Sequence, residues 1–471
     1  MHFVEEVALV IAARLRTAAF GVACALGTGT IGQAQPVAPI AIRNARIVPV
    51  SGAPIDGGSI VLVNGLIKSV GSNVDVPAEA VVIDGTGLTV YPGLIDALTD
   101  LGMAQPTAAP PAGAAPGGGP NAPRPPSRIR GPEDRPGSTP WLQAADEFRA
   151  DDRRIETWRN GGVTTVVTAP RVGIFPGQAA VINLSGERRE DVVVRSAVAV
   201  PLVMTPPAGG GTFPGSTMGL VAYVRQVFLD TRYTAEQVKR YDQDARGKAR
   251  PETDRTVQAL QAALQAKVPF LLPAGNEVQI DRMLALGREF DVPAVLYGVH
   301  EGYAAAGRIA KARIPVIVSA KWPEKPKDAD PDADELLETL ELRDRAPHTP
   351  AALAEQKVPF AFSSDGLATP GEFLASVRKA IKAGLPADAA LRALTIDAAR
   401  IYGVQDRLGS LEAGKIANVI VVQGDLLGDK STVKHVFVDG RRFEVPVDAS
   451  GAAPGGAGRG PSARPSEGDR R

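Results

Sequence analysis

The sequence has few cysteines, histidines and aromatic residues, and its charges cancel. One cysteine and four histidines stand among its 471 residues, and aromatic residues make up 5%. A single cysteine excludes an internal disulfide and a thiolate metal cluster, because each needs more than one thiol. The formal net charge at pH 7 is zero, so the composition gives no sign of the broad basic surface that nucleic acid or an anionic membrane attracts. We expect neither as a partner.

Several common catalytic motifs are also missing. The sequence has no Gly-x-Ser-x-Gly elbow, no phosphate-binding loop and no cysteine–histidine pair. These motifs carry the chemistry of serine hydrolases, nucleotide hydrolases and cysteine hydrolases. The sequence therefore does not indicate those classes of enzyme.

Glycine and proline are abundant, with 50 and 40 residues, and they gather in a few segments. Residues 104–140 are rich in alanine, proline and glycine, and residues 446–471 are similar with additional arginine. Such compositions bury too little apolar surface to form a core. We expect a flexible insertion at 104–140 and a disordered tail at 446–471.

The first 34 residues resemble a secretory signal peptide. Arg14 and Arg16 supply positive charge, and residues 17–31 are apolar or small. Gly32-Gln33-Ala34 is a small-x-small cleavage site, so we expect cleavage after Ala34 and a periplasmic or extracellular protein. The apolar run is too short and too rich in glycine for a membrane span, and no other membrane contact is expected.

Two alternatives to a cleaved signal remain open. The segment could form an ordinary buried helix. Cys24 could instead be lipidated, although Gly21 stands where a lipidation motif prefers leucine. If the signal is removed, Cys24 is removed with it and the mature protein has no thiol.

Both ends of the globular part have β character. Residues 37–90 contain short β-branched runs, and Asn64-Gly65 between two of them is a strong hairpin signal. Residues 403–445 contain two more such runs, at 417–422 and 435–438. Each segment is too small to hold a stable core alone, so we expect them to form one composite domain.

Residues 91–402 alternate apolar runs with amphipathic stretches. Seven runs read as strands: 88–96, 163–168, 197–203, 268–272, 294–297, 315–319 and 360–363. Fully apolar strands that alternate with helices are typical of a parallel sheet covered by helices. A closed barrel needs an eighth strand, which we expect within 181–194 or 204–267.

Motifs near both ends of this region carry a family resemblance. Tyr91-Pro92-Gly93-Leu94-Ile95-Asp96 is similar to the opening signature of the amidohydrolase superfamily, in its imidazolonepropionase-like branch. Ser364-Asp365-Gly366 resembles the end of that family's eighth strand. Segments 394–400 and 409–418 resemble its closing region, with Asn418 where an aspartate is usual.

The resemblance implies a fold and a chemistry. The fold would be a (β/α)8 barrel over 91–402 with a small β-sandwich made from 37–90 and 403–445. The chemistry would be hydrolysis of an amide or cyclic amide C–N bond in a small molecule by metal-activated water. The metal would be zinc or manganese, at the carboxyl ends of the barrel strands.

The expected metal ligands are only partly present. Leu98 and Asp100 stand where the family has two histidines, and Pro273 stands where it has a third. His300 follows a strand where the family places an imidazole ligand, although it could instead belong to a helix start. Asp365 matches the aspartate that binds metal and serves as base.

The remaining ligand set is therefore Asp100, His300 and Asp365. Two carboxylates and one imidazole suit Mn or Mg better than Zn, and the alternative is that no metal binds. Lys321, just after the strand at 315–319, is expected at the barrel mouth, where it could neutralise Asp365 or bind an anionic ligand; the alternative is an ordinary solvated lysine.

Two functions from different classes follow. The first is a C–N hydrolase by resemblance. The second is a non-catalytic barrel that binds a ligand, or that pairs with a second copy or an active paralogue. The missing histidines favour the second interpretation, and the family resemblance favours the first.

Overall fold

The computed structural model describes residues 38–104, 135–186, 188–205, 214–326, 328, 330 and 334–446. The expected signal peptide, most of the insertion at 104–140 and nearly all of the tail at 446–471 lie outside these ranges. All the elements below belong to the compact unit that begins at Pro39.

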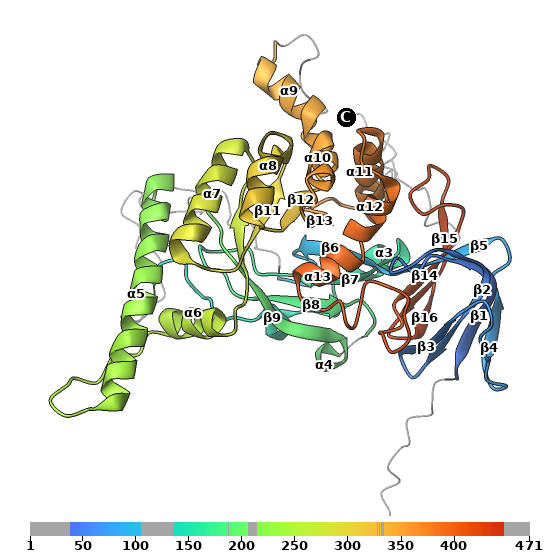
Figure 1. Cartoon of the computed structure of the whole chain (residues 1–471), viewed down its shortest axis with the longest axis horizontal. Helices are drawn as coiled ribbons and strands as arrows, with labels where there is room; N and C mark the ends of the chain where they lie inside the picture. The colour runs from blue at the N-terminus through green and yellow to red at the C-terminus, as the bar shows by residue number, and fades with distance from the viewer. Residues whose placement is uncertain are drawn as a thin grey trace, which may run out of the picture. The chain divides into compact units, whose positions relative to one another are not determined.

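Eight strands form a nearly closed barrel sheet (Figure 1). They are, in order around the sheet, β6 Leu94–Thr99, β7 Val163–Thr168, β8 Ala179–Asn183, β9 Val193–Pro201, β10 Phe270–Pro273, β11 Ala294–Val299, β12 Val316–Ser319 and β13 Phe360–Ser363. β13 lies against β6, which brings the two ends of the sheet together. The fold is thus mixed α/β with a barrel at its centre.

One strand runs against the others. β8 is antiparallel to both β7 and β9, whereas the remaining neighbours are parallel. β8 is the eighth strand, which we expected within 181–194 or 204–267. It starts two residues before the first of these ranges and overlaps it. The reason for its direction is the connection 169–178, which contains no helix. A parallel neighbour needs a longer crossover, usually through a helix. A barrel of eight parallel strands is therefore wrong for this chain.

Most of the helices surround the barrel sheet, whereas α9, at Leu337–Arg345, extends away from it (Figure 1). The helices are α2 Ala144–Glu147, α3 Arg154–Asn160, α4 Arg189–Val192, α5 Thr217–Gln243, α6 Arg255–Gln265, α7 Glu277–Phe290, α8 Gly302–Ala312, α9, α10 Thr349–Glu355, α11 Pro370–Lys382, α12 Ala387–Ala393 and α13 Ile396–Ile401, with a 3₁₀ turn, η1, at Ala346–His348. Local signals start several of them. Asn276 caps α7 through the Gln279 amide, and Thr369 caps α11 just before Pro370.

The barrel interior is filled by side chains. One apolar cluster takes a residue from every barrel strand: Leu98, Val167, Val181, Val198, Leu271, Val295, Ile317 and Ala361. A packed interior is usual for barrels of this size, whose sites lie above the core at the carboxyl ends of the strands. Leu98, at 2% exposure, is therefore part of the core.

The strands from the two ends of the chain pair in a second sheet. Its order is β16-β15-β14-β5-β1-β2-β3, with β4 beside β1. The strands are β1 Ile40–Ile47, β2 Ile55–Val63, β3 Leu66–Gly71, β4 Val81–Asp84, β5 Leu88–Pro92, β14 Val419–Gln423, β15 Thr432–Val438 and β16 Arg441–Glu444. β5 pairs with β14 and joins the two halves around their own apolar core. These strands form one sheet, and a sandwich of two packed layers remains a prediction.

The chain passes from this sheet into the barrel at Gly93. A Cβ atom there would lie 2.0 Å from the Thr164 Oγ1 atom, so only glycine fits the turn between β5 and β6. The expected first strand at 88–96 is consequently two strands in different sheets. The Pro-Gly turn of the signature motif is the boundary between them.

A buried polar network joins the second sheet to the barrel. The Asn418 amide nitrogen donates to the Asn183 Oδ1 atom at 2.8 Å and to the Thr165 Oγ1 atom at 3.0 Å. Its amide oxygen accepts from the Asp439 backbone N–H at 2.9 Å. A carboxylate could not donate the first two bonds. The asparagine at 418, where the family usually has aspartate, therefore fits its neighbours.

The end of the expected insertion contacts the helices around the barrel. Arg135 makes ion pairs of 2.7 Å with both Asp230 and Asp254, which ties this segment to α5 and to the start of α6. Ser138 is buried and bridges to Phe175. Within the described ranges, no helix has the length and apolar character to cross a bilayer.

Candidate functional site

Three side chains meet where β11, β12 and β13 end. Asp365 follows β13 with a φ of +46°, a conformation that aspartate tolerates better than most residues. Its Oδ2 atom accepts a hydrogen bond of 2.9 Å from the hydroxyl of Ser319, the last residue of β12. His300 follows β11, close enough to Asp365 for that carboxylate to raise its pKa. The structure thus brings Asp365 and His300 to the same end of the barrel.

His300 is held in one tautomer. Its Nε2 atom lies 3.0 Å from the Lys321 carbonyl oxygen. A carbonyl only accepts, so Nε2 must carry the proton and Nδ1 keeps the lone pair. Burial lowers the pKa of His300, although the Lys321 carbonyl and the Asp365 charge oppose that effect. The ring is therefore neutral at pH 7.

Lys321 contributes its backbone rather than its ammonium group. Its carbonyl accepts from His300, and its amide lies 3.3 Å from the Ser319 Oγ atom. The side chain is exposed. Lys321 therefore positions the histidine through its backbone, and its exposed side chain forms no salt bridge with Asp365 among the described residues.

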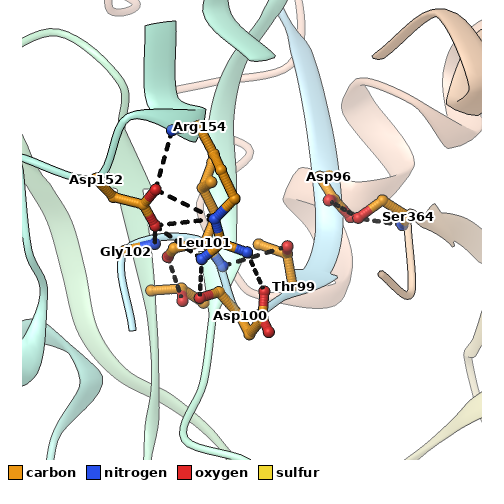
Figure 2. A network of polar contacts seen from close by, with 9 residues as sticks. Asp96, Thr99, Asp100, Leu101, Gly102, Asp152, Arg154 and Ser364 are labelled. Atoms are coloured by element: carbon orange, nitrogen blue, oxygen red, sulfur yellow. Dashed lines mark hydrogen bonds and ion pairs between the residues drawn. The ribbon is translucent and has the colours of Figure 1, made fainter. Parts of the chain in front are cut away.

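Asp100 belongs to a different network (Figure 2). Its Oδ1 atom accepts a bond of 2.9 Å from the Arg154 guanidinium, which also binds Asp152. Arg154 begins α3, outside the barrel sheet. This ion pair takes up the carboxylate that we expected beside His300 and Asp365. The structure brings two of the three predicted ligands together, but not the third.

The donor set does not fit a metal centre. In the described part of the chain, no three His, Cys, Asp or Glu side chains lie close enough together to hold a metal ion. Leu98 is buried in the core, and Pro273 ends β10 without a side-chain donor. A catalytic zinc needs about three protein ligands, and a pair of residues provides too few.

A buried carboxyl that the sequence motifs did not mark as functional lies within the barrel. Asp96, on β6, is 1% exposed. Its Oδ2 atom accepts from the Ser364 hydroxyl at 2.5 Å and its Oδ1 atom from the Ser364 amide at 3.0 Å, as Figure 2 shows. Burial raises the pKa of Asp96 to about 6, and the Ser364 bonds only partly offset this. This contact joins β6 to the end of β13, where the barrel closes.

A cation also reaches this region. Arg171 stands in the connection that follows β7, and its charge lowers the pKa values of Asp96, Tyr297 and Tyr402. Burial nevertheless leaves the pKa of Tyr297 raised, to about 12. Sequence reasoning missed Arg171, although the signal used for Asp365 was available. It is the first charged residue after an apolar strand.

Two cavities lie away from this end of the barrel. One, of about 470 Å³, is at the start of β12 and β13 and includes Pro315, Lys357 and Phe360. The other, of about 930 Å³, lies between α3 and β16 and includes Arg159 and Phe443. Neither is lined by Asp365, His300 or Arg171.

The C-terminal part of the chain matches a known family. The sequence pattern of the amidohydrolase family matches residues 308–443, from α8 to β16. The chain is 24% identical over 462 residues to the amidohydrolase tasK of Hapsidospora irregularis. That alignment covers 87% of this chain but only 44% of the relative, so the chain spans less than half of the relative's length.

Solved structures share the architecture. An amidohydrolase from Thermotoga maritima MSB8 has a TM-score of 0.68 and 25% identity, and the match covers 86% of this chain and all of that one. A Xaa-Pro dipeptidase with methionine bound in its active site has a TM-score of 0.53 and 17% identity, with coverage of 86% and 100%. The second likeness concerns the fold alone. Together with the signature at Tyr91–Asp96, these similarities support membership of the amidohydrolase superfamily.

Proposed function

We propose that this protein is a member of the superfamily that binds a small-molecule ligand at its barrel mouth without a catalytic metal centre. One observation carries the proposal. Among the described residues, no three side chains with metal-binding groups lie together, because Asp100 pairs with Arg154 away from His300 and Asp365. A catalytic metal site needs about three protein ligands that converge on one point, and His300 with Asp365 supplies only two.

The same residues suit ligand binding. Asp365 keeps one carboxylate oxygen beyond the Ser319 bond, and His300 keeps the lone pair of Nδ1. Both are acceptors that can orient the N–H or O–H groups of a ligand. The relatives act as amidohydrolases or as a dipeptidase by name, so a nitrogen-containing small molecule is the class of ligand that we propose.

Metal content tests this proposal. Protein purified without chelator and then exchanged into metal-free buffer should hold well below one zinc or manganese per chain. Asp365→Ala should leave that value unchanged, because Asp365 lacks two further ligands beside it. Inductively coupled plasma mass spectrometry on both proteins gives the measurement. Close to one metal per chain in the wild type, lost in the variant, would overturn the proposal in favour of a metal-dependent C–N hydrolase.

We also propose that the protein is exported, on the basis of the charged, apolar and small-x-small pattern that ends at Ala34. Intact-mass analysis of protein from cell fractions should find a chain that begins at Gln35, outside the cytoplasm. Ala34→Leu should block cleavage, because the processing site requires a small residue. A full-length chain in the cytoplasmic fraction of wild-type cells would contradict export.

A further inference from the structure

Arg171 lies at the end of the barrel where the site residues gather. β7 ends at Thr168, and Ala169-Pro170-Arg171 begins the connection to β8. β7 runs parallel to β6, so its end lies on the same side as the carboxyl ends of the parallel strands. The residue itself is half-buried.

Among the residues that the structure describes, no hydrogen bond or ion pair reaches the Arg171 guanidinium, and its Nε atom is buried. An arginine presents five N–H donors in a planar fork, and a buried donor without an acceptor is costly. The Nε atoms of Arg159 and Arg378 are also buried without a partner, but those two guanidinium groups make other hydrogen bonds, to Leu184 and to Leu426 and Ser431.

The neighbouring acids do not satisfy it. Asp96 uses its carboxylate oxygens for Ser364 and the Leu98 amide, and Asp365 accepts from Ser319. Arg171 affects Asp96, Tyr297 and Tyr402 through its charge and makes no direct bond to them. A structural role in which Arg171 holds two strands together would require such bonds. The described residues therefore supply no acceptor for Arg171, and a bound ligand could provide one.

The charge balance points to a singly charged acceptor. One guanidinium can pair with one carboxylate through two parallel N–H···O bonds. A doubly charged phosphate would bring excess negative charge close to Asp96 and Asp365. The barrel interior next to this end is lined by apolar residues such as Leu98 and Val167, which carry no positive charge to balance a second negative charge on a ligand.

We propose that Arg171 is the anchor for the carboxylate of the small-molecule ligand at the barrel mouth. The inference rests on the proposed function and names the ligand class: a small carboxylate whose remaining polar groups face His300 and Asp365. The guanidinium then supplies the positive charge at this end of the barrel.

Calorimetric titration tests the anchor with defined probes. Sodium phenylacetate, sodium hexanoate and N-acetylglycine are titrated into the full-length protein, each beside its neutral primary amide. The wild type should bind at least one carboxylate more tightly than the matching amide. Arg171→Gln should weaken that binding by about ten- to a hundredfold, the range expected for a charge-assisted hydrogen bond. Arg171→Lys should retain part of the affinity, because lysine keeps the positive charge but lacks the two parallel N–H donors of the guanidinium.

Two controls separate the anchor from a structural role. Arg282→Gln removes an exposed arginine of α7 and should leave binding unchanged. Thermal unfolding of ligand-free Arg171→Gln should match the wild type or lie above it, because no native bond is lost. A marked fall in its melting temperature, equal binding by the wild type and Arg171→Gln, or no preference for any carboxylate would each overturn the anchor.

The outcomes also separate the anchor from the proposed function. A stoichiometric metal together with Arg171-dependent carboxylate binding would leave the anchor standing and reject the metal-free barrel. Substoichiometric metal, together with carboxylate binding that does not depend on Arg171, would reject the anchor and leave the metal-free barrel standing.

Discussion

Replacement of Asp96 by asparagine should stabilise the protein at pH 8, by about 3 kcal/mol if all of the native hydrogen bonds are kept. The reason is the buried carboxylate. Burial raises the pKa of Asp96 from 3.8 to about 6, so the folded protein holds a proton there that the unfolded chain has already lost. An asparagine can accept from the Ser364 and Leu98 amides with its oxygen and donate to the Ser364 hydroxyl with its nitrogen.

The pH dependence has a definite sign. Below about pH 4 the carboxyl of Asp96 is protonated in both the folded and the unfolded chain, so its burial does not lower the free energy of unfolding by deprotonation. Between about pH 4 and pH 6 the folded state binds more protons than the unfolded state, so stability falls as the pH rises. Above about pH 6 Asp96 is ionised in both states, and the folded protein carries the full free-energy cost of a buried carboxylate. Urea unfolding of both proteins at pH 4.5 and pH 8 should show that the advantage of Asp96→Asn grows by about 2 kcal/mol between these pH values.

The control for this experiment is Ser364→Ala. It removes the 2.5 Å hydroxyl bond but keeps the carboxyl buried, so it should destabilise the protein and retain the pH dependence. Comparison of each variant with the wild type at the same pH cancels the titration of other groups. If the difference between Asp96→Asn and the wild type is the same at both pH values, the buried carboxylate explanation fails.

Replacement of Phe228 by alanine should lower the free energy of unfolding by about 3–5 kcal/mol. Phe228 lies on α5 and is 3% exposed. Its ring stacks on Phe290 at 4.2 Å between centroids and lies 5.2 Å from Phe270 and 6.1 Å from Phe175. It thereby connects α5, α7, β10 and the β7–β8 connection. The variant would lose apolar burial and leave a cavity among rings that cannot all move inward.

Leu229→Ala is the matched control, because it is the next residue on α5 but 57% exposed. Its effect should stay within about 0.5 kcal/mol, as for an ordinary surface position. Guanidinium unfolding followed by circular dichroism measures both variants. Similar losses for the two would mean that helix propensity, rather than the aromatic contacts, determines the effect of Phe228→Ala.

The carboxylate anchor and the metal-free barrel have a common physical basis. A metal bound at the barrel mouth would concentrate positive charge there. Here Leu98 and Pro273 remove ligand positions, and Arg154 takes up Asp100. Arg171 is the cation whose charge reaches Asp96 and Tyr297. Under the proposal, a ligand that carries its own negative charge would bind to Arg171 without a metal.

The sequence by itself determined the parts of this protein that depend on local pattern. Apolar strands between amphipathic stretches predicted seven of the eight barrel strands, and the Pro-Gly turn with Asp365 predicted the family. The ends of these strands also predicted that Asp365 and His300 lie on one side, because consecutive parallel strands must point the same way. Strand positions and strand-end residues can be predicted in this way because each depends on residues that are close together in the sequence.

Only the tertiary structure decided the direction of β8 and the partners of the site residues. A short run such as Ala179–Asn183 has the same composition in either direction, and only the length and path of its connections set the pairing. Asp96 binds Ser364, 268 positions away, and Arg154 binds Asp100 across 54 positions. No local pattern encodes these contacts. They arise when the barrel closes and the helices pack.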